Sequence, residues 1–423
     1  MVSKRLRHRC LIIYAIVLLQ GMHTALASPA PSPPPEARAE VSVPERGEWL
    51  VEGLLRCYTC HSPRDKNAPG WPIVQGKKGA GRIYSESPGR RNVARNITPH
   101  TESGIGAWSD ETLARAIREG IGHDGRALSM AMPSSYFREL SDSDLAAVIT
   151  YLRKQPAVDQ ENPRTVLPED EQEQLTAELQ PLERSVAAVD PTDTIAYGRY
   201  LVRVSQCVGC HTAWEAPRTP GLLAGGNDID GIFSSNITPH ASGIGYSKPA
   251  FLTIMRTGKG GVLSGEMPWQ AYRHLPDREL GALYDFLHTL HPFSHLVSNA
   301  VPSSQCTVCG QEHGLGKQNR IEIPEGVTVD DGVLAAYAGS YVFPAWDMTV
   351  EVSFEDGVLY VQEEGRPRTP LVALSTDRFI YSGAFAPVRF SRNQQGRVHE
   401  MISEEVDELV FERVVEPDKE VGR

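Results

Sequence analysis

Residues 57–61 read CYTCH, and residues 207–211 read CVGCH. Each stretch contains two cysteines separated by two residues, and a histidine follows the second cysteine directly. A third pair, Cys306 and Cys309, has the same spacing, but Gly310 stands where the histidine would be. These three C-x-x-C pairs account for all but one of the seven cysteines, and the third pair needs a separate explanation.

The C-x-x-C-H pattern is typical of the covalent attachment of c-type haem. Both thiols form thioether bonds with the haem vinyl groups, and the adjacent imidazole becomes an axial ligand of the iron. A redox-active cysteine pair or half of a zinc site can produce one such pattern, but two copies in matching context favour haem. The sequence therefore predicts two covalently bound haem c groups, with thioethers from Cys57, Cys60, Cys207 and Cys210 and axial imidazoles from His61 and His211.

The two C-x-x-C-H stretches belong to an internal repeat. In both copies N-I-T-P, G-I-G and a late Met-Pro pair follow in the same order. Each copy opens with an amphipathic helix that ends at the cysteines and closes with a second amphipathic helix, which predicts two small all-α units at residues 46–155 and 195–295. Gly47 and Gly198 lie at matching places in the opening helices, where a missing side chain would let the closing helix cross at short distance.

Polar residues also match between the copies. Ser141 and Asp144 form a capping-box pattern ahead of the first closing helix, and Asp277 can cap the second. Arg118 and Arg256 occupy equivalent positions, and we expect both to be solvated at the surface.

These motifs resemble class I cytochrome c domains. The likeness is greatest to the cytochrome c subunits of bacterial alcohol and aldehyde dehydrogenases and to related dihaem cytochromes, which share C-x-x-C-H, N-I-T-P, G-I-G and Met-Pro. It covers residues 46–155 and 195–291, about half of the chain. The resemblance implies two helical domains that each enclose a haem.

A haem iron that only carries electrons needs a sixth ligand. Of the eight methionines, only Met132 and Met267 recur at equivalent positions, each followed by proline, whereas Met130 has neither feature. A thioether opposite imidazole raises the reduction potential of the iron. His100 and His240 also recur, but they follow N-I-T-P, which resembles the family's loop beside the haem propionates. We therefore predict Met132 and Met267 as axial ligands and interpret the two histidines as loop residues.

Two filled axial positions leave no vacant site on the iron for oxygen or peroxide. We therefore predict a dihaem c-type cytochrome that transfers single electrons between a dehydrogenase and a downstream respiratory acceptor, either another cytochrome or a terminal oxidase. We predict no catalytic residue, and we interpret the chain as an electron-transfer protein or oxidoreductase subunit rather than a self-contained enzyme. The alternatives are a dihaem peroxidase-like enzyme and a haem-based sensor.

The first residues predict export. Residues 1–27 combine a basic start, a short apolar run and Ala-Leu-Ala, which is typical of a cleaved signal peptide. A retained membrane anchor is the weaker alternative, because the apolar run at 10–19 is about half the length that spans a bilayer. We expect a periplasmic protein with no transmembrane segment in the mature chain. Its net charge of -11 argues against nucleic acid or anionic lipid as a partner.

The rest of the chain divides by composition and periodicity. Residues 28–45 read as a Pro/Ala linker and residues 156–194 as an acidic linker with one short helix. A junction at 296–325 precedes residues 326–423, where alternating patterns predict about six to eight short strands in a small antiparallel barrel or sandwich. Asp356-Gly357 is a hairpin signal. This module resembles the lipocalin-like β-barrels appended to β-lactamase-related hydrolases, and we interpret it as a docking module or a structural cap.

The third cysteine pair differs from the first two. Gly310 supplies no iron ligand, and the stretch lacks a Met-Pro pair, so we predict no third haem. Cys306, Cys309 and His313 have plausible spacing for zinc, with His295 as one candidate for the fourth ligand. Two free thiols in an oxidising compartment tend to pair, so we predict a Cys306–Cys309 disulfide, with zinc as the alternative.

Overall fold

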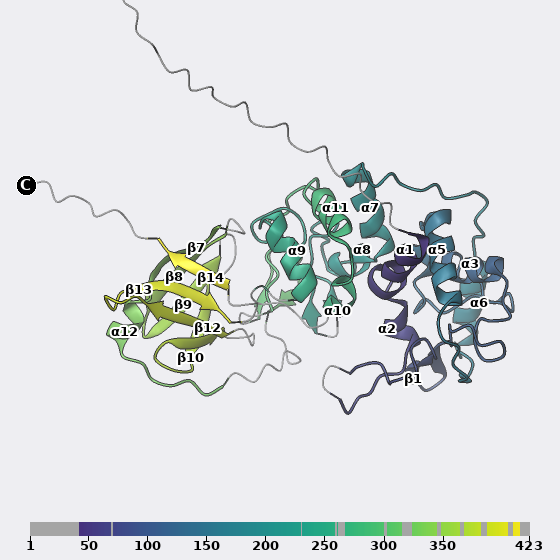
Figure 1. Ribbon diagram of the computed structural model, residues 1–423, viewed down its shortest axis with the longest axis horizontal. Coiled ribbons are helices and arrows are strands. Elements are labelled where there is room, and N and C mark those ends of the chain that lie inside the picture. Colours follow the sequence, from purple (N-terminus) through teal and green to yellow (C-terminus); the bar gives the residue numbers. More distant parts are fainter. Residues whose placement is uncertain are drawn as a thin grey trace, which may run out of the picture. The chain divides into compact units, whose positions relative to one another are not determined.

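The computed structural model describes most of the chain from Ser42 onward (Figure 1). The predicted signal peptide and most of the Pro/Ala linker lie outside the described residues, as does part of the junction. No helix of the described part combines the length and apolar character needed to cross a membrane. The described residues are 42–68, 71–229, 231–258, 260, 267–299, 303–314, 324–344, 348–363, 368–381, 387–404 and 409–414.

The first repeat is mainly helical, with one short hairpin. Its opening helix continues from an α-helical part into a π-helical part, and its closing helix packs back against the opening one. The sequence did not predict the β1-β2 hairpin between them. In chain order the elements are α1 (Val43–Trp49), η1 (Leu50–Leu54), α2 (Cys57–His61), β1 (Arg82–Ser87), β2 (Arg90–Ala94), α3 (Asp110–Arg118), α4 (Ser134–Phe137) and α5 (Asp142–Arg153).

The second repeat has the same order of elements, and its hairpin is shorter. A single helix, α6 (Glu169–Ala177), lies in the predicted acidic linker between the repeats. The elements of the second repeat are α7 (Thr194–Val204), α8 (Cys207–His211), β3 (Asp228–Ile229), β4 (Ile232–Phe233), α9 (Lys248–Thr257), α10 (Trp269–Tyr272) and α11 (Asp277–Leu287).

Both helix crossings depend on glycine, as predicted. A Cβ atom on Gly47 would lie 2.3 Å from the carbonyl oxygen of Ala147, and one on Gly198 would lie 1.9 Å from that of Ala282. Real Cβ atoms do not approach backbone this closely, so any larger residue would push the closing helix away. The apolar side chains of both crossings belong to one continuous buried core.

The first turns of the two closing helices confirm one expected cap and correct the other. Ser141 caps α5 as predicted, but the residue before α11 is Pro276, and Asp277 makes no cap. Instead, Arg256 donates to Asp277 and, at 2.6 Å, to the carbonyl of Arg273.

The equivalent arginine of the first repeat makes the equivalent contacts. Arg118 pairs with Asp142 and donates to the carbonyl of Leu140 at 2.7 Å. It is only 8% exposed, so the expectation of a solvated arginine is wrong for Arg118. Both arginines tie the helix before the Met-Pro segment to the start of the closing helix.

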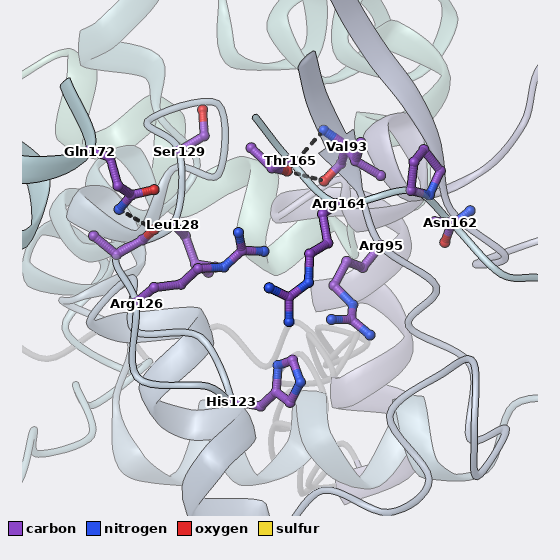
Figure 2. A pocket seen from close by; sticks show the side chains of 12 residues that line it. Val93, Arg95, His123, Arg126, Leu128, Ser129, Asn162, Arg164, Thr165 and Gln172 are labelled. Carbon is purple, nitrogen blue, oxygen red and sulfur yellow. Dashed lines mark hydrogen bonds between the residues drawn. The ribbon is translucent and has the colours of Figure 1, made fainter. Parts of the chain in front are cut away.

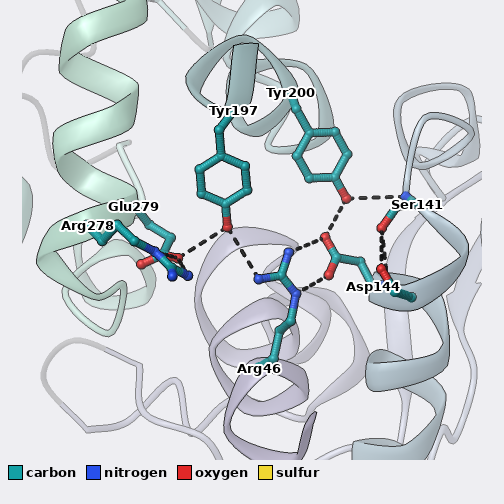
Figure 3. A network of polar contacts seen from close by, with 8 residues as sticks. Arg46, Ser141, Asp144, Tyr197, Tyr200, Arg278 and Glu279 are labelled. Carbon is teal, nitrogen blue, oxygen red and sulfur yellow. Dashed lines mark hydrogen bonds and ion pairs between the residues drawn. The ribbon is translucent and has the colours of Figure 1, made fainter. Parts of the chain in front are cut away.

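A buried polar network joins residues of the two repeats (Figure 3). Asp144 is paired with Arg46 and also accepts from the hydroxyl of Tyr200 at 2.6 Å. Tyr197 donates to Glu279 at 3.1 Å and accepts from Arg46 at 3.4 Å. Both carboxylates are fully buried. Because charges are costly to bury without partners, this arrangement favours one docking geometry of the repeats.

The C-terminal module is a closed antiparallel barrel in which every strand pairs with its neighbours in sequence and β14 pairs back with β7. This confirms the barrel over the sandwich. The predicted hairpin turn is also confirmed, because Asp356 and Gly357 have φ values of 49° and 79°. The module contains α12 (Asp331–Ala335) and β7 (Gly339–Phe343), β8 (Met348–Glu355), β9 (Val358–Glu363), β10 (Thr369–Ala373), β11 (Arg378–Tyr381), β12 (Pro387–Arg392), β13 (Val398–Ser403) and β14 (Leu409–Arg413).

The crossing of α7 and α11 gives the first testable prediction. We expect Gly198→Ala to destabilise the protein by about 1–3 kcal/mol, because the new methyl group overlaps the backbone of α11. Thermal unfolding followed by far-ultraviolet circular dichroism measures the loss. Gly281→Ala in α11 is the matched control, since its Cβ would meet only the flexible end of Lys248 at 3.1 Å. Equal melting of the two variants would contradict the close crossing.

Candidate haem-binding sites

The two C-x-x-C-H stretches form matching short helices. Each begins after a residue in the left-handed conformation, Arg56 with φ 54° and Gln206 with φ 68°. In a helix, residues i, i+3 and i+4 share one face. Cys57, Cys60 and His61 therefore lie on one face of α2, and the second motif places its residues in the same way on α8. This arrangement suits a planar group that is bonded at two edges and ligated at its centre.

The pKa values of these cysteines argue against a redox-active pair. Burial raises the pKa of the Cys57 thiol to about 12, and burial also raises the pKa of Cys207. A redox-active C-x-x-C motif instead lowers the pKa of its nucleophilic thiol. The environment of both pairs therefore differs from that of a thiol-disulfide catalyst.

Each motif histidine is oriented by a backbone carbonyl. The Nδ1 atom of His61 lies 2.6 Å from the carbonyl oxygen of Arg95, and that of His211 lies 2.8 Å from the carbonyl oxygen of Ser235. A carbonyl can only accept, so Nδ1 carries the proton and Nε2 keeps its lone pair for a metal. Burial lowers the pKa of both imidazoles, which keeps them neutral. Both histidines thus fit the role of iron ligand.

The asparagine of N-I-T-P holds each of these carbonyls in place. Asn96 follows Arg95, is fully buried, and accepts from both the backbone and the hydroxyl of Thr98, at 2.9 and 2.7 Å. Its amide donates to the carbonyl of Val158 at 2.8 Å. Asn236 repeats this pattern, with its amide 2.8 Å from a carbonyl of the segment that follows α11. The motif is therefore a structural clamp beside the histidine.

His100 and His240 make equivalent contacts within their loops. The Nδ1 atom of His100 accepts from the backbone N–H of Ser103 at 3.2 Å, and that of His240 accepts from Ser242 at 3.0 Å. The hydroxyl groups of the same serines lie 2.9 and 2.8 Å from these nitrogen atoms. These contacts fit our interpretation of both histidines as loop residues.

The two repeated methionines pack against the core, and each immediately precedes the proline that starts a short helix. Met132 comes before α4 and Met267 before α10. Met130, in contrast, is 79% exposed. The structure thus separates the two predicted ligands from the unmatched methionine, and their ligation stays a prediction.

A cationic pocket of the first repeat was missed by the sequence analysis (Figure 2). Arg95, Arg126 and Arg164 line it together with His123. The Arg95 guanidinium lies 5.3 Å from the ring centre of Trp108, which in turn stacks on His123. Burial and the nearby charge of Arg126 lower the pKa of Arg95. The pocket is therefore poised to receive an anionic group next to the carbonyl that orients His61.

The sequence indicates only some of the residues that line this pocket. The basic run that precedes N-I-T-P includes Arg95, but the second repeat has Ser235 at that position. Arg164 and Gln172 come from the predicted acidic linker, and Gln172 donates to the carbonyl of Ala127 at 3.2 Å. The start of this linker thus packs against the first repeat.

The third C-x-x-C pair has a different backbone. Cys306 and Cys309 lie in a turn between two short strands, β5 (Ser304–Gln305) and β6 (Glu312–His313). Gly310 has a φ value of 78°, so the chain leaves the turn in the left-handed conformation instead of continuing as a helix. The helical face on which the other two motifs place their cysteines and histidine is missing here, and the absence of a third haem stays a prediction. The predicted disulfide stays a prediction.

Comparison with known families identifies two parts of the chain. Residues 45–156 match the cytochrome c family, and residues 324–414 match a domain of unknown function, DUF3471. The first repeat is therefore a cytochrome c domain, a class that carries covalently bound haem c.

Individual relatives include two subunits of bacterial dehydrogenases and one diheme cytochrome. One subunit of the nicotinate dehydrogenase of Pseudomonas putida is 29% identical, over 62% of this chain and 24% of that protein. The fructose dehydrogenase cytochrome subunit of Gluconobacter japonicus is 28% identical, over 65% of this chain and 57% of that protein. A diheme cytochrome c-type protein of Cereibacter sphaeroides is 32% identical, over 27% of this chain and 36% of that protein. The chain is thus homologous to cytochrome c subunits of bacterial dehydrogenases and spans only part of each relative.

The buried asparagine clamp gives the second testable prediction. We expect Asn96→Ala to lower the stability of the first repeat by about 1–3 kcal/mol, because the buried Thr98 and the half-buried Val158 lose hydrogen bonds to the asparagine side chain. Thermal unfolding of the purified protein measures this loss. Asn67→Ala, at an exposed asparagine of the same repeat, is the control. If the two variants melted alike, the clamp would have no energetic role.

Proposed function

We propose that this chain is a dihaem c-type cytochrome that relays single electrons from a dehydrogenase to a respiratory acceptor. The observation that carries the proposal is the duplicated histidine geometry. In both repeats the imidazole follows a helical C-x-x-C, and a carbonyl next to a buried asparagine fixes its tautomer. The first repeat is a cytochrome c domain, so the same geometry supports a second haem in the second repeat.

The chain's own residues would perform four tasks at each haem. The cysteine pair would form the two thioether bonds, and the histidine would offer Nε2 to the iron. Met132 in the first repeat and Met267 in the second would offer a thioether sulfur to the iron. The apolar core around them excludes water. When bound, the haem supplies a one-electron couple between ferric and ferrous iron.

The cationic pocket would bind the haem propionates of the first repeat. Propionates are carboxylates, and Arg95, Arg126 and Arg164 offer guanidinium groups that suit them. Their positive charge favours ferrous over ferric iron, because the ferric state carries the additional positive charge. The second repeat has Ser235 in place of Arg95, so the two haems would differ in reduction potential.

The partners follow from the relatives and from the start of the chain. Two relatives are named as subunits of nicotinate and fructose dehydrogenases, which supports a dehydrogenase as the electron donor. The signal-peptide pattern at residues 1–27 supports export to the periplasm, where another cytochrome or a terminal oxidase would accept the electrons. We assign no nucleic acid partner to this acidic chain.

The barrel would serve as a docking or structural module, similar to lipocalin-like modules. Its strands close on themselves and leave no free edge for pairing with another chain. Aromatic side chains fill much of its interior, with Tyr337 stacked on Phe390 at 4.4 Å. Packing of this kind favours a role for the outer surface over ligand binding inside the barrel.

Haem counting gives the third testable prediction. Mass spectrometry of the denatured full chain should show two covalently attached haems, and electron paramagnetic resonance of the oxidised protein should show only low-spin iron. Replacing both cysteines of either C-x-x-C-H motif by alanine should remove one haem. Replacing Cys306 and Cys309 should remove none. A single haem would contradict the dihaem proposal, and two haems with a persistent high-spin signal and peroxide turnover would favour the peroxidase-like alternative.

Ligand replacement gives the fourth testable prediction. Met132→Ala and Met267→Ala should each abolish the sulfur-to-iron charge-transfer band of one haem and lower its reduction potential, because thioether ligation favours ferrous iron. Optical spectroscopy and potentiometric titration report both effects. Met130→Ala is the control, because this exposed methionine has no counterpart in the second repeat. The same loss in His100→Ala or His240→Ala would disprove the assignment.

A further inference from the structure

Four metal-binding side chains converge where the second repeat meets the β5-β6 hairpin. They are His295, Cys306, Cys309 and His313, and one ligand atom from each lies within 4.8 Å of every other. His295 and Cys309 are fully buried, and His313 is 7% exposed. His295 follows α11, while the other three residues belong to the hairpin and its turn. Two separate segments thus contribute donors to one buried point.

The two histidines have nitrogen atoms that lack a partner. The Nδ1 atom of His295 lies 2.7 Å from the carbonyl oxygen of Ala224, so this nitrogen carries the proton and Nε2 keeps a lone pair. Among the described residues, the Nε2 atoms of both His295 and His313 are buried without a hydrogen-bond partner. A buried polar atom without a partner destabilises the folded protein. A metal ion at the centre of the cluster would bind both lone pairs.

Backbone hydrogen bonds hold the turn that carries the two cysteines, and one of them reaches the Cys306 sulfur. The backbone N–H of Cys306 donates to Gln311 at 2.8 Å, and that of Gly310 donates to Cys306 at 3.0 Å. The N–H of Val308 points at the Cys306 sulfur from 3.4 Å. A hydrogen bond to sulfur favours the thiolate, which is the form that binds metal.

The wall of the second repeat leaves room for the cluster. Gly226 has a φ value of 91°, and a Cβ atom there would lie 2.8 Å from the His295 ring. Gln311 donates to the carbonyl of Gly226 at 3.1 Å, and the backbone N–H of Arg218 donates to the carbonyl of Cys309 at 3.0 Å. The hairpin is therefore held against the repeat on both sides of the four ligands.

We propose that these four residues bind a structural zinc ion in a tetrahedral Cys2His2 site. Two thiolates and two neutral imidazoles are a typical zinc ligand set, and they leave no open position for a substrate. On binding, the two thiols release two protons, and the two thiolate charges cancel that of the ion. The cluster is thus neutral, which suits its burial.

The histidines favour zinc over the disulfide predicted from the cysteine spacing. A disulfide would use both sulfur atoms but leave the two buried Nε2 atoms without partners. Zinc uses all four donors. The ion would also link the hairpin to the second repeat, because its ligand His295 donates to the carbonyl of Ala224. The chain that follows Ala224 leads to Ser235, whose carbonyl orients His211.

The fifth testable prediction concerns the haem-loaded full chain, purified without reductant and dialysed after exposure to zinc sulfate. Elemental analysis should find one zinc per chain, counted separately from the haem iron. X-ray absorption at the zinc edge should show two sulfur ligands at about 2.3 Å and two nitrogen ligands at about 2.0–2.1 Å. Absence of zinc together with an intramolecular Cys306–Cys309 disulfide in the mass spectrum would overturn the proposal. Zinc with only oxygen and nitrogen ligands would overturn it as well.

Variants locate the ion. His313→Gln should lower zinc affinity at least about 10-fold, because losing a ligand should cost no less than losing a residue that only orients a ligand. The variant should also lower the melting temperature of the zinc-loaded protein. His291→Gln is the matched control, since His291 is exposed and lies outside the cluster. Equal zinc affinity in both variants would refute the site. The absorption spectrum of unmodified protein decides the ligand set even if His313→Gln folds poorly.

Discussion

The hydrogen bond between each motif histidine and a backbone carbonyl is the interaction on which the rest of this protein depends. His61 contacts Arg95 and His211 contacts Ser235, and in both cases the carbonyl is the acceptor. A carbonyl can do this only if its own backbone is fixed. Asn96 fixes it in the first repeat through bonds to its own loop and to the segment after the closing helix. The orientation of His61 therefore rests on a segment that lies 62 residues beyond Asn96 in the chain.

The two repeats share the asparagine clamp but differ in the side chain that the segment after the closing helix adds to it. In the first, the segment after α5 supplies the carbonyl of Val158, and the side chain of Gln160 donates to the carbonyl of Gly81. In the second, the ring of His295 takes the place of the Gln160 amide, because its Nδ1 atom donates to the carbonyl of Ala224. Its Nε2 atom is buried and belongs to the cluster with the hairpin residues. Gln311 of the hairpin then reaches the carbonyl of Gly226. The first repeat is thus closed by its own continuation, whereas the second is closed by a separate hairpin.

Features set by neighbours in sequence could be predicted, and features set by distant neighbours could not. The helix that runs up to each C-x-x-C-H stretch, the turn at Asp356 and the short strands of the β-module follow from local spacing and periodicity, whereas the closure of the barrel does not. The crossing at Gly198 followed from the repeat, because two copies revealed a shared glycine. The expectation of a solvated Arg118 is wrong because its partners, the carbonyl of Leu140 and Asp142, lie more than 20 residues away in the sequence and reach it only when the closing helix packs. Arg95 and Arg164 meet only after the predicted linker folds back, so no local pattern indicated their pocket.

The position of the left-handed residue separates the third C-x-x-C pair from the first two. In the C-x-x-C-H motifs this residue precedes the first cysteine, as at Arg56, and the helix then runs through the histidine. In the third pair the left-handed residue is Gly310, which follows the second cysteine. Glycine adopts this conformation without steric cost, but a histidine there would be strained. Glycine therefore suits this position of the hairpin turn better than histidine does, and the imidazoles beside these thiols come from His295 and His313 instead.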